Sequence, residues 1–118
     1  MKQIDIVFPH ERLSVVNEIL YKHKVGGLLF HDIKGRGRAK REAISEVVQG
    51  YATGKAYVPE FGTRTKLEAL VSDSLAKQII DDILGSLSTG SASDRKIFVK
   101  DVAEAYDIGT KHSGDVAL

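Results

Sequence analysis

The sequence predicts one α+β domain in which each half of the chain contributes a strand, a helix and a second strand. Residues 2–8 alternate between apolar and polar side chains, and residues 65–71 do so again after a long irregular segment. Each alternating run is followed by apolar residues at helical spacing, over 12–24 and again from residue 73. This repeated order favours a single two-layer sandwich of helices on a sheet.

The first half divides at residues that end regular structure. Pro9 ends the strand over 2–8, because proline supplies no backbone N–H for a ladder. The helix over 12–24 stops at the glycine pair 26–27, and an apolar run at 28–34 predicts the second strand. The apolar stripe of this helix consists of Leu13, Val16, Ile19 and Leu20.

The second half follows the same plan. A strand is expected over 65–71, Ser72 and Asp73 favour the start of a helix, and the polar segment 88–95 leads into a strand over 96–100. A short element is expected around residues 102–106. The helical stripe comprises Leu75, Ile79, Ile80, Ile83, Leu84 and Leu87.

Together these elements predict a ferredoxin-like βαββαβ sandwich with both helices on one face of the sheet. The strands carry apolar residues on both faces, so we expect a second copy of the chain to cover the other face. The segment 35–62 between the halves is a long loop, and loops of that length are usually functional or disordered. Within it, the spacing of apolar residues allows a short helix over 39–48.

Composition excludes several classes of protein. The 118 residues include no cysteine, which excludes a disulfide scaffold, thiolate metal sites and cysteine catalysis. With 17 basic and 16 acidic residues the chain is not a globally basic nucleic-acid binder.

No apolar run approaches the ~20 residues of a membrane span. The start of the chain lacks a signal-peptide pattern, so we expect a cytoplasmic protein with no membrane insertion. The histidines His10, His23, His31 and His112 lack zinc-ligand spacing, so no metal site is predicted.

Two loops have the composition of anion sites. In residues 34–41, five of eight side chains are basic and two are glycine, which lets the backbone approach a phosphate closely. Residues 89–96 combine small side chains with Arg95 and Lys96. A solvated basic loop and a flexible connector are the alternative interpretations of these two segments.

Three segments together resemble the PII signal-transduction family. They are KGRGR at 34–38, GKAYVPEF at 54–61 and TGSASDRKIFVKDV at 89–102, and the resemblance covers essentially the whole chain. It implies a homotrimer that binds ADP, AMP or ATP in clefts between subunits. It also implies a T-loop at 35–62 that contacts a membrane transporter or a metabolic enzyme. A B-loop at 88–96 and a C-terminal loop at 107–118 from the neighbouring subunit would complete the cleft.

The resemblance also implies roles for individual residues. Arg38 and Arg64 would bind a small carboxylate such as bicarbonate or 2-oxoglutarate, and Tyr57 stands where some members carry a modified tyrosine. No catalytic residue is implied, so the chain is expected not to be an enzyme. Nucleotide-binding roles fall on Gly35, Gly37, Arg38, Glu68, Thr89, Gly90, Asp94, Arg95 and Lys96.

Several positions depart from the family pattern. Ala39 replaces the usual glutamine that helps to hold magnesium and 2-oxoglutarate, and Arg64 replaces a lysine of different geometry. Asp107 and Gly109 replace the Arg-x-Arg pair of the C-terminal loop, which should weaken binding to a triphosphate, although Arg95 adds a cation to the B-loop. These departures favour a diverged member that responds to ADP, AMP or bicarbonate in inorganic-carbon metabolism. Ordinary signalling by ATP and 2-oxoglutarate in nitrogen metabolism remains the alternative.

Two other classes of function remain alternatives. Val48, Gln49 and Gly50 resemble part of the anion cradle of acylphosphatases, but the following Phe-Arg is missing and the segment does not follow the first strand. Nucleic-acid binding through the basic loop is disfavoured because the chain offers no aromatic stacking platform.

Overall fold

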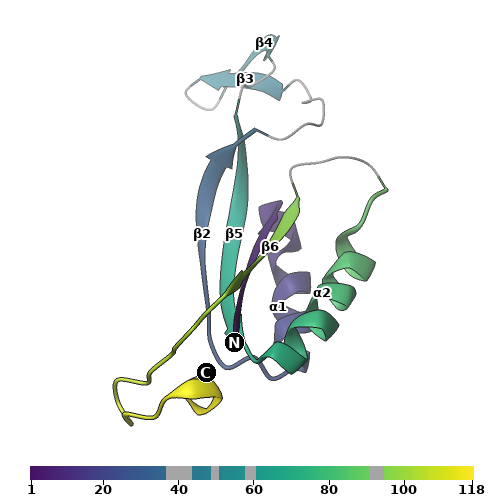
Figure 1. Cartoon of the computed structure of the whole chain (residues 1–118). Helices are drawn as coiled ribbons and strands as arrows, with labels where there is room; N and C mark the ends of the chain where they lie inside the picture. Colours follow the sequence, from purple (N-terminus) through teal and green to yellow (C-terminus); the bar gives the residue numbers. More distant parts are fainter. Residues whose placement is uncertain (37–43, 49–50, 58–60, 91–94) are drawn as a thin grey trace.

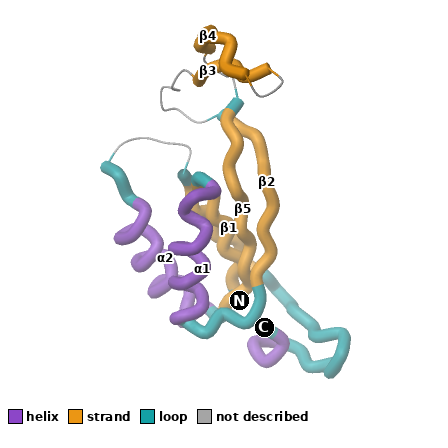
Figure 2. The backbone as a smooth tube through the Cα atoms, turned by 180° about the vertical axis from the view of Figure 1, so that it is seen from behind, coloured by secondary structure: helices purple, strands orange, loops and turns teal. Residues whose placement is uncertain are grey.

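Four strands form one antiparallel sheet in the order β2–β5–β1–β6, and two helices cover one of its faces (Figures 1 and 2). The computed structural model describes residues 1–36, 44–48, 51–57, 61–90 and 95–118. The elements are β1 (Lys2–Phe8), η1 (His10–Arg12), α1 (Leu13–Lys22), β2 (Leu28–Gly35), β3 (Ile44–Val48), β4 (Tyr51–Tyr57), β5 (Gly62–Val71), α2 (Asp73–Leu87), β6 (Lys96–Asp101) and η2 (Gly114–Ala117). This strand order confirms the predicted ferredoxin-like sandwich.

The core lies between the sheet and the helices. Ile6 pairs with Leu67 on β5 and with Ile97 on β6, so these apolar side chains share the helix-covered face. Burying each such aliphatic side chain contributes about 1.5–3 kcal/mol to folding. The buried apolar residues are Ile4, Ile6, Phe8, Val16, Leu20, Leu67, Ala69, Val71, Ala76, Ile79, Ile83 and Leu87.

The prediction of a helix over 39–48 is wrong for its second half. Residues 44–48 form β3, which pairs with β4, with an irregularity in register between Ser45 and Val47. The β-branched side chains of Ile44, Val47 and Val48 explain this outcome, because they favour extended backbone over helix. Residues 39–43 lie outside the described residues. The segment 35–62 therefore contains a paired hairpin, which stands beyond the ends of β2 and β5 (Figure 1).

Other boundaries differ in smaller ways. The predicted first helix begins as the 3-10 turn η1 and becomes α-helical at Leu13. Ser72 precedes α2, but its hydroxyl makes no capping hydrogen bond and lies 3.2 Å from the Ser74 hydroxyl. Residues 102–105 form neither helix nor strand, so the predicted element there is wrong; Tyr106 makes a single bridge with Ser113.

The second face of the sheet is uncovered in the single chain. Leu29 on β2 is 72% exposed and Phe98 on β6 is 52% exposed, and both lie on this face. Exposed apolar side chains on both outer strands agree with the expectation that another copy covers this face. No helix in the described part of the chain is long and apolar enough to cross a membrane.

Candidate functional site

Three strands and a helix position candidate site residues at one end of the sandwich. At this end β2 finishes with Gly35, which pairs with Gly62 at the start of β5. Lys96 begins β6 and pairs with Val7 near the end of β1. The helix α2 ends here too, and Thr89 and Gly90 follow it (Figure 1). The structure thus brings both predicted anion loops to the same end of the sheet.

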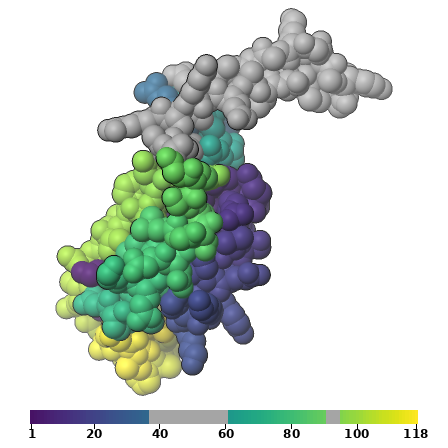
Figure 3. Space-filling model, turned by 90° about the vertical axis from the view of Figure 1, so that its right-hand side faces the viewer, coloured from purple at the N-terminus to yellow at the C-terminus, as the bar shows by residue number. Residues whose placement is uncertain are grey.

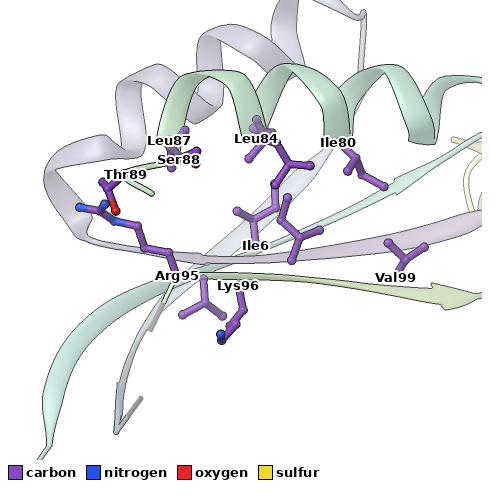
Figure 4. A pocket seen from close by; sticks show the side chains of 12 residues that line it. Ile6, Ile80, Leu84, Leu87, Ser88, Thr89, Arg95, Lys96 and Val99 are labelled. Carbon is purple, nitrogen blue, oxygen red and sulfur yellow. The ribbon is translucent and has the colours of Figure 1, made fainter. Parts of the chain in front are cut away.

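A groove of about 420 Å³ opens between α2 and β6 at this end (Figure 4). The side chains of Ile80, Leu84 and Leu87 point from the helix toward the strands. Arg95 and Lys96 stand at the strand side; the Arg95 side chain extends toward Thr89, whereas the Lys96 side chain points away from α2 (Figure 4). The full lining is Ile6, Val7, Ile80, Ile83, Leu84, Leu87, Ser88, Thr89, Arg95, Lys96, Ile97 and Val99. An apolar groove with the cation of Arg95 at its mouth suits a ligand with a flat apolar part and an anionic part.

Backbone geometry separates two of the three predicted glycines. Gly90 has a φ of +77°, a left-handed conformation that strongly favours glycine, so the fold itself requires it. At Gly35 an added Cβ would meet nothing within 4 Å among the described residues. Packing in one chain therefore gives no reason for glycine at position 35.

Arg64 lies on β5 near the same end of the sheet. It pairs with Ile33 and its Nη1 donates a hydrogen bond to the carbonyl oxygen of Thr63 at 2.7 Å. Side chains alternate along a strand, so Arg64 and Lys66 lie on the uncovered face of the sheet. Lys96 shares that face, because it stands in the same row as Val7 and Lys66.

Glu68 lies away from this end. It lies six positions after Gly62 on β5, a distance of about 20 Å along a strand. Its Oε1 lies 3.5 Å from the Lys66 ammonium, in the middle of the uncovered face. One chain therefore keeps Glu68 far from the end of β2, but places it only two residues along the sheet from the row of Lys96.

Sequence reasoning missed an ionic cluster beside Glu68. The Asp5 carboxylate is only 1% exposed, although it lies on the uncovered face. It accepts a hydrogen bond from Gln3 Nε2 at 2.8 Å and lies 2.9 Å from Lys100 Nζ and 3.9 Å from Lys66 Nζ. The alternation of residues 2–8 placed Gln3 and Asp5 on one face, but only the strand register supplies their lysine partners.

This cluster keeps Asp5 ionised. Burial alone would raise the pKa of the Asp5 carboxyl, but hydrogen bonds from Gln3 and Lys100 and the nearby positive charges hold that pKa below its usual range. In return, the hydrogen bond to Asp5 raises the pKa of Lys100.

The tail residue Asp107 organises a turn. Its Oδ1 accepts a hydrogen bond from the Thr110 N–H at 2.9 Å, and its own N–H donates to the His112 carbonyl oxygen at 2.8 Å. The backbone hydrogen bond from Thr110 lowers the pKa of Asp107. In one chain this turn lies far from the start of β6 (Figure 1).

The structure describes only some of the remaining predicted residues. Gly37, Arg38 and Asp94 lie outside the described residues. Tyr57 is the last residue of β4, where its backbone pairs with Ile44. Within the described ranges, no group of three or more histidine, aspartate or glutamate side chains is placed to hold a metal ion.

Comparisons with known proteins identify the family. The family model described as "Nitrogen regulatory protein P-II" matches residues 1–112. The chain is 32% identical over 118 residues to Nitrogen regulatory protein P-II of Klebsiella oxytoca and to Nitrogen regulatory protein P-II 1 of Escherichia coli strain K12, covering 100% of each chain. It is 33% identical over 114 residues to the P-II protein of Bradyrhizobium diazoefficiens, covering 97% of this chain and 96% of the relative.

A solved structure agrees with these relatives. The structure of B. subtilis GlnK has a TM-score of 0.73 and 25% sequence identity to this chain, and covers 99% of this chain and 97% of its own. The whole length therefore matches in sequence and in fold, which confirms the resemblance that the loop motifs indicated. The chain belongs to the nitrogen regulatory protein P-II family.

Proposed function

We propose that this chain is a PII-type signal transducer that binds an adenine nucleotide between subunits. Through the segment 35–62 it would control the activity of a membrane transporter or an enzyme. The observation that carries this proposal is the convergence of the ends of β2 and α2 with the starts of β5 and β6. Each of these ends belongs to a loop that sequence reasoning assigned to anion binding.

The charge at this end suits a phosphate. Arg36, Arg64, Arg95 and Lys96 all lie at or near it, and arginine binds phosphate oxygens through two parallel hydrogen bonds. Gly90 has the left-handed φ of +77°, a conformation found in backbone concavities that bind anions. The aliphatic groove beside Arg95 offers an apolar surface for a base.

A site between subunits accounts for the position of Glu68. Glu68 lies six positions along β5 from Gly62, about 20 Å from the row of Gly35, so in this proposal Glu68 acts on the ligand of a neighbour. The exposed Leu29 and Phe98 supply apolar contact for such an assembly. We propose a homotrimer, as the family resemblance implies.

The segment 35–62 connects ligand to partner. It leaves the sheet at Gly35 and returns at Gly62, so both of its ends adjoin the anion-binding end. A ligand that binds one arrangement of these ends better than another shifts the population of that arrangement. The partner would then bind the hairpin β3–β4 in one ligand state and release it in the other.

The proposed ligand preference follows from the loop residues that differ from the family pattern. Ala39 offers no oxygen to a metal or to 2-oxoglutarate, and Asp107 adds a negative charge to the tail. We therefore propose ADP or AMP as the preferred nucleotide, with bicarbonate as the second ligand held by Arg38 and Arg64.

Calorimetric titration tests the proposal. ATP, ADP, AMP and cyclic AMP are each titrated into the purified chain, with and without 2-oxoglutarate or bicarbonate. Lys96→Ala should weaken nucleotide binding at least tenfold, whereas Lys77→Ala on the exposed face of α2 should leave it unchanged. Absence of nucleotide binding would overturn the function and leave the fold. Release of phosphate from an acyl phosphate would instead support the enzyme alternative.

A further inference from the structure

Three side chains form a hydrogen-bonded series at the anion-binding end of the sheet. His10 Nδ1 lies 2.9 Å from the Thr65 hydroxyl oxygen, and that oxygen lies 3.3 Å from Asp32 Oδ1. Asp32 pairs with Thr65 across β2 and β5, and His10 begins η1, just after β1. In Figure 3 atoms from the first part of the chain, in purple, adjoin the teal beginning of β5 at the upper end of the molecule. The series therefore connects η1 to the two strands between which the segment 35–62 lies.

The Thr65 hydroxyl is the central member of this series, and its side chain is fully buried, whereas His10 and Asp32 are exposed. Its single proton can be donated to Asp32 or to His10, but not to both. When the hydroxyl donates to Asp32, its oxygen is free to accept a hydrogen bond from a protonated His10 Nδ1. The protonation of His10 therefore decides which way the buried hydroxyl points.

Protonated His10 permits only one arrangement. Both ring nitrogens then carry a proton, so Nδ1 donates to Thr65 and the hydroxyl donates to Asp32. His10 Nδ1 also lies 3.7 Å from Asp32 Oδ1, so the positive ring attracts the carboxylate directly. Neutral His10 with its proton on Nε2 accepts at Nδ1 instead, and the hydroxyl then turns away from Asp32. Histidine changes between these states within roughly pH 5 to 8.

Asp32 is the charged group that the His10 ring faces most closely in the described part of the chain. The charged residues around the ring there are Glu11 and Arg12 from η1 and Asp32 and Lys34 from β2. The Arg12 guanidinium is directed to α2, where its Nη2 donates to the Ser86 carbonyl oxygen at 3.1 Å. The adjoining positions of β1, β5 and α1 are uncharged, since they hold Phe8, Thr63 and Ser14. A proton gained by His10 therefore acts chiefly on Asp32.

We propose that His10 is a proton-dependent positioning residue, which when protonated holds the end of β2 through Thr65 and Asp32 and so places Gly35 for contact with a phosphate. This inference rests on the proposed function, because it assigns regulation by protons to the same anion-binding end. Asp32 precedes Gly35 by three positions, about 10 Å along the strand. A strand end that is already held binds a ligand without the cost of ordering it. Nucleotide affinity should therefore rise as the pH falls and His10 gains its proton.

Carboxyl-carbon NMR of Asp32 tests the hydrogen-bonded series without any ligand. In the wild-type chain the chemical shift of the Asp32 carboxyl carbon should change between roughly pH 5.5 and 8, where histidine titrates. In His10→Asn this change should disappear, because the asparagine amide donates near the position of Nδ1 but does not titrate. A carboxyl signal that stays constant in the wild-type chain, or changes equally in both chains, overturns the inference.

ADP affinity at roughly pH 5.5 and 8 tests the effect on binding. Thr65→Val removes the hydroxyl and leaves an apolar side chain of similar shape in a buried position. The wild-type chain should bind ADP about fivefold more tightly than Thr65→Val at the lower pH, a factor at the low end of usual coupling between sites, and equally at the higher pH. His10→Asn should match the wild-type chain at the lower pH and bind more tightly at the higher pH. Because phosphate groups titrate in the same range, affinities are compared between chains at one pH.

Thr63→Val is the matched control. It makes the same chemical change on β5, but the Thr63 hydroxyl is bonded to neither His10 nor Asp32. Its ADP affinity should equal that of the wild-type chain at both pH values. A wild-type chain that binds ADP with the same advantage over Thr65→Val at both pH values overturns this inference and leaves the signal transducer. A wild-type chain that binds no nucleotide at either pH overturns both.

Discussion

Lys100 on β6 reaches across to Asp5 on β1, with its ammonium 2.9 Å from the carboxylate, on the face of the sheet that the helices leave uncovered. The two residues are diagonal neighbours, since Lys100 pairs with Gln3 and Asp5 pairs with Phe98. Gln3 donates a further hydrogen bond to the same carboxyl group. A charged side chain is thereby buried at the centre of the sheet because its partners supply both hydrogen bonds and charge.

Replacing Asp5 with asparagine should destabilise the fold. The variant keeps the shape but removes the charge that two lysines face, which should lower the free energy of unfolding by about 1–3 kcal/mol. Urea denaturation followed by circular dichroism measures this change. Asp81→Asn is the control, because Asp81 forms an exposed pair with Lys77 that should contribute less than about 0.5 kcal/mol. Equal effects of the two variants would contradict the role given to Asp5.

The Asp5 carboxylate should also determine how the free energy of unfolding falls at acid pH. The pKa of Asp5 is lower in the folded chain than its ordinary value of 3.8, so the unfolded chain binds the proton more readily. Its contribution is therefore fully present well above pH 3.8 and is lost as the pH falls through the lower folded pKa. Urea denaturation is measured from roughly pH 2.5 to roughly pH 6, which brackets the ordinary pKa of an aspartate. The free energy of unfolding should fall less steeply with pH in Asp5→Asn than in the wild-type chain. Parallel curves would contradict this prediction.

The order of elements was predictable because it depends on local patterns. Alternation identified β1 and β5, and the apolar stripes identified α1 and α2, since each pattern reflects one buried face. The hairpin β3–β4 was missed because the few apolar residues of 44–48 fit both periods, and pairing with the next strand, β4, decided between them.

The candidate site was predictable only in part. Glycine and basic residues marked both loops, because phosphate binding needs those residue types close together in sequence. The partners of Asp5 and the turn at Asp107 depend on contacts between residues that a sequence pattern does not relate. The distance between Glu68 and Gly35 likewise follows from strand register, which the sequence pattern does not give.

The two glycines of the site should respond differently to alanine. Gly35→Ala should change the free energy of unfolding by less than about 0.5 kcal/mol, because the added methyl meets none of the described residues. It should nevertheless weaken nucleotide binding at least tenfold, because the methyl group blocks close approach of a phosphate to the backbone. Gly90→Ala should cost about 1 kcal/mol of stability, because alanine is strained at a φ of +77°. Calorimetry and urea denaturation separate the two effects, and a large loss of stability in Gly35→Ala would contradict the assignment.

A charge on the uncovered face should prevent association. Leu29 and Phe98 lie on opposite outer strands, so a neighbour that covers this face would bury both. Phe98→Glu should shift the chain from oligomer to monomer in light scattering at micromolar concentration, because an unpaired buried charge costs several kcal/mol. Tyr21→Glu places the same charge on the exposed side of α1 and should leave the mass unchanged. Thermal unfolding of the Phe98→Glu monomer should remain cooperative, since Phe98 takes no part in the core of the single chain. If the variant keeps the mass of the wild-type oligomer, this face is not the interface.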